Sequence, residues 1–349
     1  MTPFAARIAT RLEVAPEDAH RIVRALGVVF VASFGLGVLK AAQSGLFLAS
    51  CPRARIPAAF FASAICLATA SSLVVAVARR IGADTLTRMC LGVGGLVIAC
   101  AHLAITLAIP EAPFSLYVAA EAVSGVLIVQ IWSVVSHAID VRTGKRVLPI
   151  AGVVSAVAWA SCGLVVPLAS HALGTPSLLA LAAALLFAAA WLVVPERTSV
   201  RREAPGMLVG LREGFVFLAQ DPLARLLTSL AVLSMVLEQT MDFALLSAAR
   251  DLYRGDAALA TFVARFYGAT SALSVLTLLG AAGRVLSRLG AVRTLALMPV
   301  AVALVAGFGV VLPVFAVVVA YRGVGRVLKQ AVWSASSEQL SSPLPATRK

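Results

Sequence analysis

The sequence predicts an all-α protein that crosses a membrane about ten times. Of its 349 residues, 60% are hydrophobic and only 13% are charged, roughly half the charged fraction of an ordinary soluble domain. The mean hydropathy is +0.97. Apolar runs of about 20 residues, the length needed to cross a bilayer as a helix, recur along the chain. These runs lack the alternation of a β-barrel, so we expect helices.

Ten runs are long and apolar enough to span. We place them at roughly 25–48, 57–78, 89–109, 113–137, 147–169, 177–195, 226–248, 259–281, 292–311 and 313–334.

The longest polar interruption divides the spans into six and four. The expected organisation is a cytoplasmic segment at 1–24, a six-helix bundle at 25–195 and a linker with an amphipathic surface helix at 196–225. A four-helix bundle at 226–334 and a cytoplasmic tail at 335–349 follow. The motif Arg-Ile-Gly-Ala at 80–83 resembles Arg-Leu-Gly-Ala at 288–291, at the equivalent turn of the second bundle. This similarity favours a two-fold repeat, as in many transporters.

The net charge of +13 is explained by topology rather than by a nucleic-acid partner. Cytoplasmic segments of membrane proteins are enriched in Lys and Arg. Eighteen cations fall in the N-terminal segment and the even-numbered loops, whereas the opposite side has only four: Arg53, Arg55, Arg250 and Arg254. We therefore expect a multi-pass protein of a cell inner membrane with its N-terminus in the cytoplasm.

Ionisable residues inside the spans mark the candidate functional site, because a charge in hydrocarbon is costly and usually serves a pathway or a partner. All but Arg265 fall on spans 1, 4, 7 and 10, the four helices that line the central cavity in the major facilitator architecture. The predicted substrate-binding residues are Lys40, Glu121, Glu238, Asp242, Arg322 and Arg326.

Helical spacing supports a shared polar face. Glu238 and Asp242 are four residues apart, as are Arg322 and Arg326, so each pair lies on one side of its helix. Arg322 falls roughly 15 Å from the outer end of its span, near mid-membrane. With Lys329, which could instead snorkel to the interface, the set has one more cation than anions. The excess favours an anionic solute, and paired guanidinium groups suit phosphate or carboxylate.

The alternative reading of these charges is structural. An ion pair between Lys40 and Asp242 across the two bundles is the most obvious one, and Arg265 is expected to have a structural or interfacial role. No Walker A, nucleophile-elbow or zinc-binding motif is present, and the cysteines and histidines are scattered, so we expect neither an enzyme nor a cofactor.

Five segments of the chain have a recognisable pattern: Leu39–Leu48, Trp132-Ser133 with Asp140 and Lys145-Arg146, Pro149–Gly152, Phe266-Tyr267-Gly268 and the terminal Pro343–Ala346 with Arg348-Lys349. These segments resemble those of bacterial and plastid ATP/ADP translocase-like proteins, a nucleotide-transporter branch of the major facilitator superfamily. The resemblance implies nucleotide exchange, an antiport, with Lys40 near the phosphates. It also implies a twelve-span fold, so we expect the last two spans to be missing.

Three functions follow from these observations. The first is a secondary transporter that moves an organic anion, such as a nucleotide, by alternating access. The second is a proton-coupled carrier of another small solute, with Glu238 or Asp242 as the coupling carboxylate. The third is a non-transporting scaffold or sensor derived from a transporter. The expected partners are the lipid bilayer and a small solute; the oligomeric state is left open.

Overall fold

The computed structural model describes residues 16–78, 80–137, 141–194, 220–278, 307 and 315–329. Every regular element in these ranges is helical. The elements are α2 (Pro16–Ser50), the 3-10 turn η1 (Arg53–Arg55), α3 (Ile56–Ala78), α4 (Ala83–Thr106), α5 (Ala112–His137), α6 (Val141–Leu173), α7 (Thr175–Leu192), α9 (Pro222–Leu252), α10 (Asp256–Thr277) and α12 (Phe315–Leu328).

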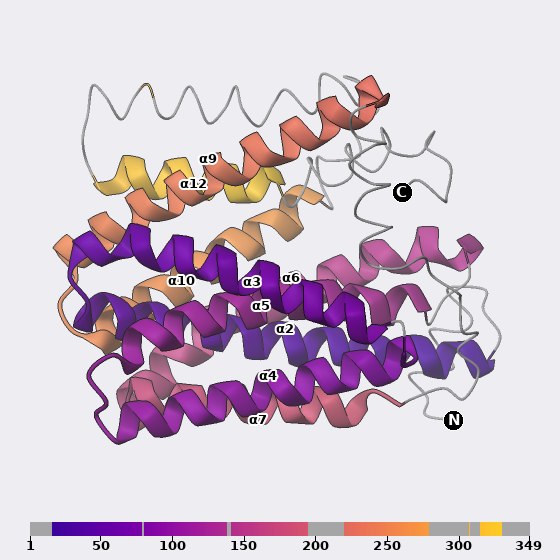
Figure 1. The fold of residues 1–349 in the computed structure, drawn as a ribbon, viewed down its shortest axis with the longest axis horizontal. Helices are drawn as coiled ribbons and strands as arrows, with labels where there is room; N and C mark the ends of the chain where they lie inside the picture. The colour runs from indigo at the N-terminus through magenta and orange to yellow at the C-terminus, as the bar shows by residue number, and fades with distance from the viewer. Residues whose placement is uncertain are drawn as a thin grey trace.

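The helices run back and forth along one long axis (Figure 1). One end of the molecule, at the left of Figure 1, holds the short connections 51–55, 107–111, 174 and 253–255; we call it the short-loop end. Two of these turns depend on glycine. Gly174 and Gly255 have φ angles of 80° and 88°, a conformation that side chains with a Cβ rarely adopt.

The expectation of an all-helical membrane protein is confirmed. Seven of the described helices are long and apolar enough to cross a membrane. The two others correspond to spans 7 and 10. Helix α9 carries several ionisable residues, and α12 is described over only 14 residues. The expected ninth span, 292–311, apart from residue 307, and most of the linker at 196–225 lie outside the described residues.

Large apolar side chains on the outside of the molecule fit a lipid environment. Phe61, Ile65, Leu73 and Val75 on α3 are all at least half exposed, as are Leu226, Leu233 and Val236 on α9. Such patches would favour aggregation in water. Helix α2, in contrast, is mostly buried and packs against α5, α6, α7 and α10. The chain is therefore a multi-pass membrane protein with α2 at its centre.

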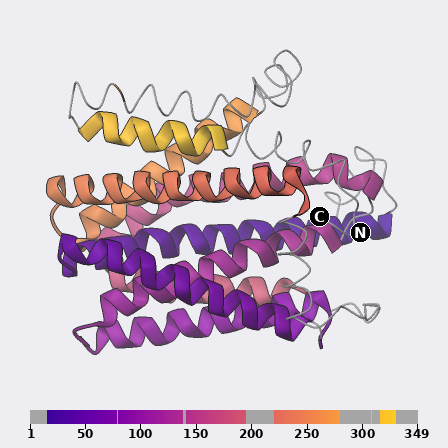
Figure 2. The same cartoon turned by 45° about the horizontal axis from the view of Figure 1, so that its top comes forward.

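The helices before the linker, α2 to α7, meet the helices after it mainly through α10. Helix α10 packs closely against α6 and α2 (Figure 2). Small residues permit this approach: a Cβ atom added to Gly268 would lie only 2.8 Å from the Cα atom of Gly163. Near the short-loop end, a Cβ on Gly45 would lie 2.6 Å from the backbone oxygen of Asp256. The contact between the two sets of helices is therefore a close backbone contact.

Candidate functional site

The predicted site residues come from four helices, and all but Arg326 belong to two clusters of ion pairs. Lys40 lies on α2, Glu121 on α5, Glu238 and Asp242 on α9, and Arg322 and Arg326 on α12. Helices α2 and α5 pack together, and so do α9 and α12. Each packed pair contributes one cluster.

The first cluster, which we call the N-terminal cluster, consists of Lys40, Gln43 and Glu121. The Nζ atom of Lys40 lies 2.5 Å from Oε1 of Glu121. The side-chain amide of Gln43 donates to the same oxygen. The Lys40 ammonium also lies 5.8 Å from the ring centroid of Tyr117. Because both ions are mostly buried and the carboxylate has two donors, the charge of Lys40 is well compensated.

The second cluster, the C-terminal cluster, consists of Glu238, Asp242, Arg322 and Lys329. Arg322 donates to both oxygens of Asp242, with N–O distances of 2.5 and 3.0 Å. Its Nη1 atom lies 3.7 Å from Glu238, whose other oxygen is 2.5 Å from Nζ of Lys329. Arg322 itself is only 5% exposed. Two carboxylates therefore neutralise two cations on the facing helix.

Arg326 is the remaining cation, and it lies between two aromatic rings. Its guanidinium carbon is 4.4 Å from the ring centroid of Tyr267 and 5.2 Å from that of Trp159. No carboxylate pairs with Arg326 among the described residues, and its Nε atom is buried without a hydrogen-bond partner there. Cation–π contacts stabilise the charge but leave the N–H donors at the edge of the guanidinium group unused.

The pairing differs from the sequence-based expectation in one respect. The predicted ion pair between Lys40 and Asp242 is wrong. Lys40 pairs with Glu121, and Asp242 pairs with Arg322. The reason is helix packing, since each carboxylate meets the cation on the helix that it packs against. Asp242 is nonetheless close enough to Lys40 for electrostatic interaction. The two clusters are thus neighbours.

The structure also shows the surroundings of two further ionisable residues, Lys329 and Arg265. Lys329 forms an ion pair with Glu238, and its side chain is 40% exposed. The side chain therefore has a partner and is also partly accessible from outside the bundle. Arg265 on α10 is exposed and is not part of either cluster.

Sequence reasoning missed three residues of the site: Gln43, Trp159 and Tyr267. Tyr267 donates a hydrogen bond to Asp242 at 3.4 Å and faces Trp159, with ring centroids 5.7 Å apart. The available signal was that Trp159 and Tyr267 are aromatic residues with polar groups in the middle of spans 5 and 8.

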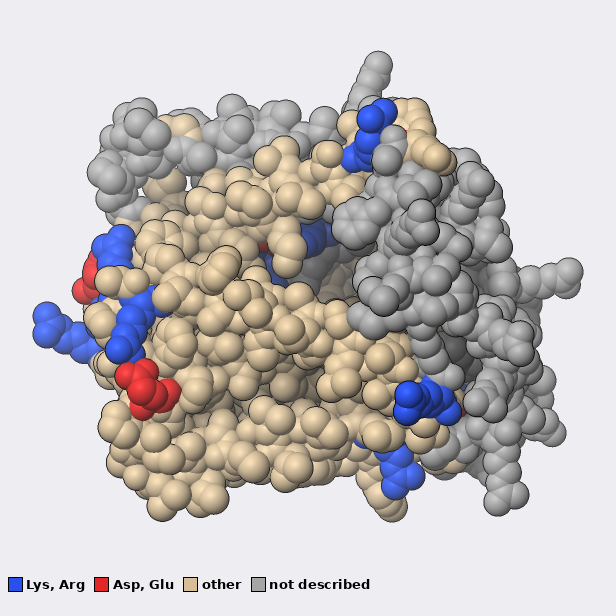
Figure 3. Space-filling model, viewed as in Figure 1, with Lys and Arg blue, Asp and Glu red and all other residues tan. Residues whose placement is uncertain are grey.

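The space-filling view shows a hollow in the middle of one face of the molecule (Figure 3). Lys or Arg atoms, with a small area of Asp or Glu, are visible inside it, while the surrounding surface is almost free of charge. Charged groups at the centre of an apolar bundle are the pattern expected for a solute pathway. Within the described ranges, no group of His, Cys, Asp and Glu side chains could hold a metal ion.

The described helices form an α-helical, multi-pass membrane protein with a helix bundle of the major facilitator fold. A solved structure supports the assignment: a point mutant of the nucleoside transporter NupG superimposes with a TM-score of 0.67. The match covers 94% of this chain and 84% of NupG, at 16% sequence identity. No protein-family model and no curated protein matches the sequence. The likeness therefore establishes the fold, and it does not single out the ATP/ADP translocase branch.

Proposed function

We propose that this protein is a secondary transporter that moves an organic anion across the membrane by alternating access. The observation that carries the proposal is Arg326. Lys40, Arg322 and Lys329 each have a carboxylate partner, whereas Arg326 has none in the described part of the chain. The described part of the site therefore has one positive charge without a carboxylate partner.

The geometry of Arg326 suits an anion. Tyr267 and Trp159 lie near the guanidinium carbon, and a stacked guanidinium group still presents its N–H donors in its own plane. Those donors match the two oxygens of a carboxylate or phosphate. We therefore assign Arg326 as the main anion-binding residue, with Lys40, Glu121, Glu238, Asp242 and Arg322 lining the same site.

The placement of the ion pairs supports a rocking motion. Lys40 pairs within α2–α7, and the C-terminal cluster pairs within α9 and α12. The two sets of helices could therefore rotate relative to one another without separating these charges, as alternating access requires. Contacts that would change include the aromatic contact of Trp159 with Arg326, the packing of α10 against α6, and the exposed ion pair of Arg53 with Asp251, 3.4 Å apart at the short-loop end.

A nucleotide is the solute that we favour within this class. The resemblance of the sequence to ATP/ADP translocase-like proteins implies one, and a nucleotide would bring phosphates for the guanidinium edge. The structural neighbour NupG is named a nucleoside transporter, and a nucleoside is a nucleotide without its phosphates.

The test is uptake by the full chain in liposomes. Labelled ATP is offered against internal ADP, and a panel of other organic anions follows. We compare the wild type with Arg326→Gln, and use Arg254→Gln as the matched control because Arg254 is exposed near the short-loop end. Uptake that is lost in Arg326→Gln and kept in Arg254→Gln supports the proposal. Absence of uptake of every anion by folded protein contradicts it and favours a non-transporting scaffold.

The same liposomes separate two coupling modes. Exchange that needs an internal anion indicates an antiporter. Uptake that instead follows an imposed pH gradient indicates a proton-coupled carrier, in which Glu238 or Asp242 would exchange the proton.

A further inference from the structure

An apolar groove of about 830 Å³ lies on the side of α10 and α12 that faces away from the ion pairs. Arg322 and Arg326 are on the cavity side of α12, whereas Val319, Gly323 and Val327 of the same helix line the groove. A volume of this size is typical of ligand pockets. The groove is thus a second space, distinct from the proposed transport site.

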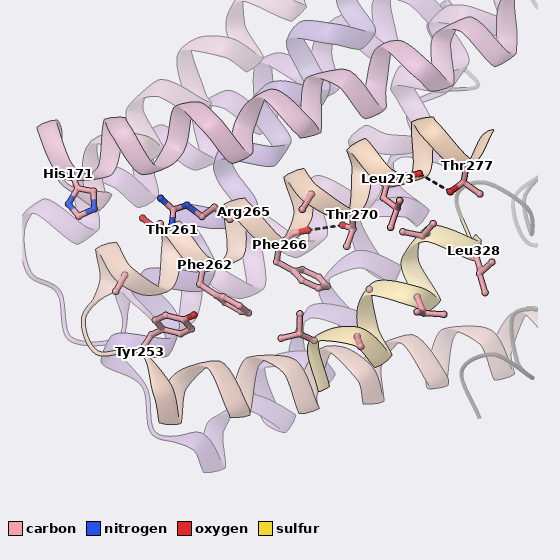
Figure 4. A pocket seen from close by; sticks show the side chains of 17 residues that line it. His171, Tyr253, Thr261, Phe262, Arg265, Phe266, Thr270, Leu273, Thr277 and Leu328 are labelled. Carbon is pink, nitrogen blue, oxygen red and sulfur yellow. Dashed lines mark hydrogen bonds between the residues drawn. The ribbon is translucent and has the colours of Figure 1, made fainter. Parts of the chain in front are cut away.

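The arginine and the histidine of the groove are at one end of it. His171, Thr261 and Arg265 lie toward the short-loop end, whereas Leu273 and Leu328 lie toward the other end (Figure 4). His171 belongs to α6, so the groove is lined by helices from both sides of the linker. Its lining therefore has a cationic end and an apolar body.

Arg265 lacks the compensation that the cavity cations have. It is nine residues along α10 from Asp256, roughly 14 Å from the end of the helix. No ion pair or hydrogen bond of its guanidinium group is present among the described residues. A guanidinium group without a counter-charge at this depth of the bilayer is energetically costly. An anion in the groove would remove that cost.

We propose that the groove binds an anionic phospholipid, with its phosphate on Arg265 and an acyl chain along the apolar body. Leu273, which lines the groove, is 53% exposed, so the groove opens toward the membrane. Helical side chains lean toward the N-terminus of their helix. The Arg265 side chain therefore reaches toward the short-loop end, where headgroups of that leaflet lie. A bound lipid would contact α6, α10 and α12.

Gly323 offers a way to block the groove without touching its charge. A Cβ atom at Gly323 would lie 3.6 Å from Thr270 and 3.8 Å from Phe266, which is ordinary contact distance. Gly323→Ala should therefore be tolerated. The longer side chain of Gly323→Leu would extend into the groove and occupy the position of the acyl chain.

The experiment measures lipid binding to the purified full chain in detergent by native mass spectrometry. Phosphatidylglycerol and phosphatidylcholine with the same acyl chains are the probes. We expect the wild type, Gly323→Ala and the control Arg254→Gln to prefer phosphatidylglycerol roughly tenfold. Arg265→Gln should lose that preference, and Gly323→Leu should lose bound lipid of both kinds.

Two results would overturn the proposal: equal binding of the two lipids by the wild type, or an unchanged preference in Arg265→Gln. If a folded Gly323→Leu variant still bound lipid, the groove would be excluded as the binding site of the acyl chain. Transport is not a readout here, so the outcome is independent of the proposed function.

Discussion

Arg322 on α12 binds both carboxylate oxygens of Asp242 on α9, 80 positions earlier in the chain. This two-point contact cancels the charge of Arg322, which is only 5% exposed. Arg326, one turn further along α12, has no such partner in the described residues. The difference between the two arginines is the basis of the functional proposal, and it makes distinct predictions for stability and for transport.

Removing the acidic partner of Arg322 should destabilise the fold. Asp242→Asn keeps the shape of the side chain but leaves Arg322 buried beside a neutral amide. We expect the free energy of unfolding in mixed micelles to fall by about 3–5 kcal/mol, as for other buried pairs that lose one partner. Asp251→Asn is the control, because its ion pair with Arg53 is exposed and worth at most about 1 kcal/mol. Equal effects of the two substitutions would contradict a structural role for the buried pair.

The contact between Lys40 and Glu121 should behave as a true pair in a double-mutant experiment. Lys40→Glu puts two carboxylates together, and Glu121→Lys puts two ammonium groups together, so each single variant should be poorly stable. The double exchange restores opposite charges, and we expect a coupling energy of about 1–3 kcal/mol. Thermal unfolding of the four proteins measures it. Additive effects would mean that the two residues do not interact.

The close approach of α6 and α10 should depend on Gly268. In Gly268→Ala the new methyl group meets backbone atoms of Gly163 at 2.8 Å, and backbone cannot rotate away. We expect the two helices to separate, with a lower unfolding temperature and less folded protein by size-exclusion chromatography. Gly27→Ala is the matched control, since a Cβ there has nothing within 4 Å. If Gly268→Ala were as stable as the wild type, α6 and α10 would have to be further apart at this position than in the structure.

Keeping the charge at position 326 should not be enough for transport. Arg326→Lys retains one positive charge but loses the planar group that lies between Tyr267 and Trp159 and offers paired donors. We expect uptake in liposomes to fall roughly tenfold, corresponding to about 1.4 kcal/mol of lost binding. Uptake equal to that of the wild type would mean that only charge matters at this position.

The sequence predicted the helical fold well because the signal for it is local. Each described span follows an apolar run that can be read without knowledge of its neighbours. The polar faces of α9 and α12 were also predictable, since residues four apart on a helix share a side. Glu238 with Asp242, and Arg322 with Arg326, lie as that spacing requires.

The partners of these charges could not be predicted, because they depend on how each helix is rotated against another. Lys40 had several acidic residues within reach, and only the packing of α2 against α5 selects Glu121. The ring contacts of Arg326 join residues of α6, α10 and α12, separated by more than 50 positions. Arg265 and its groove likewise result from packing, and a lone arginine in a span does not reveal which side of the helix it faces.

The proposed anion site is tested most directly by the fluorescence of Trp159, measured in a variant that retains no other tryptophan. The ring centroid of Trp159 lies 5.2 Å from the guanidinium carbon of Arg326. Titration with ATP, ADP and simpler organic anions should give a saturable change for at least one of them. That change should disappear in Arg326→Gln and persist in Arg254→Gln, which removes an exposed cation outside both clusters. A change that is identical in both variants, or absent for every anion with the folded protein, would contradict an anion site at Arg326.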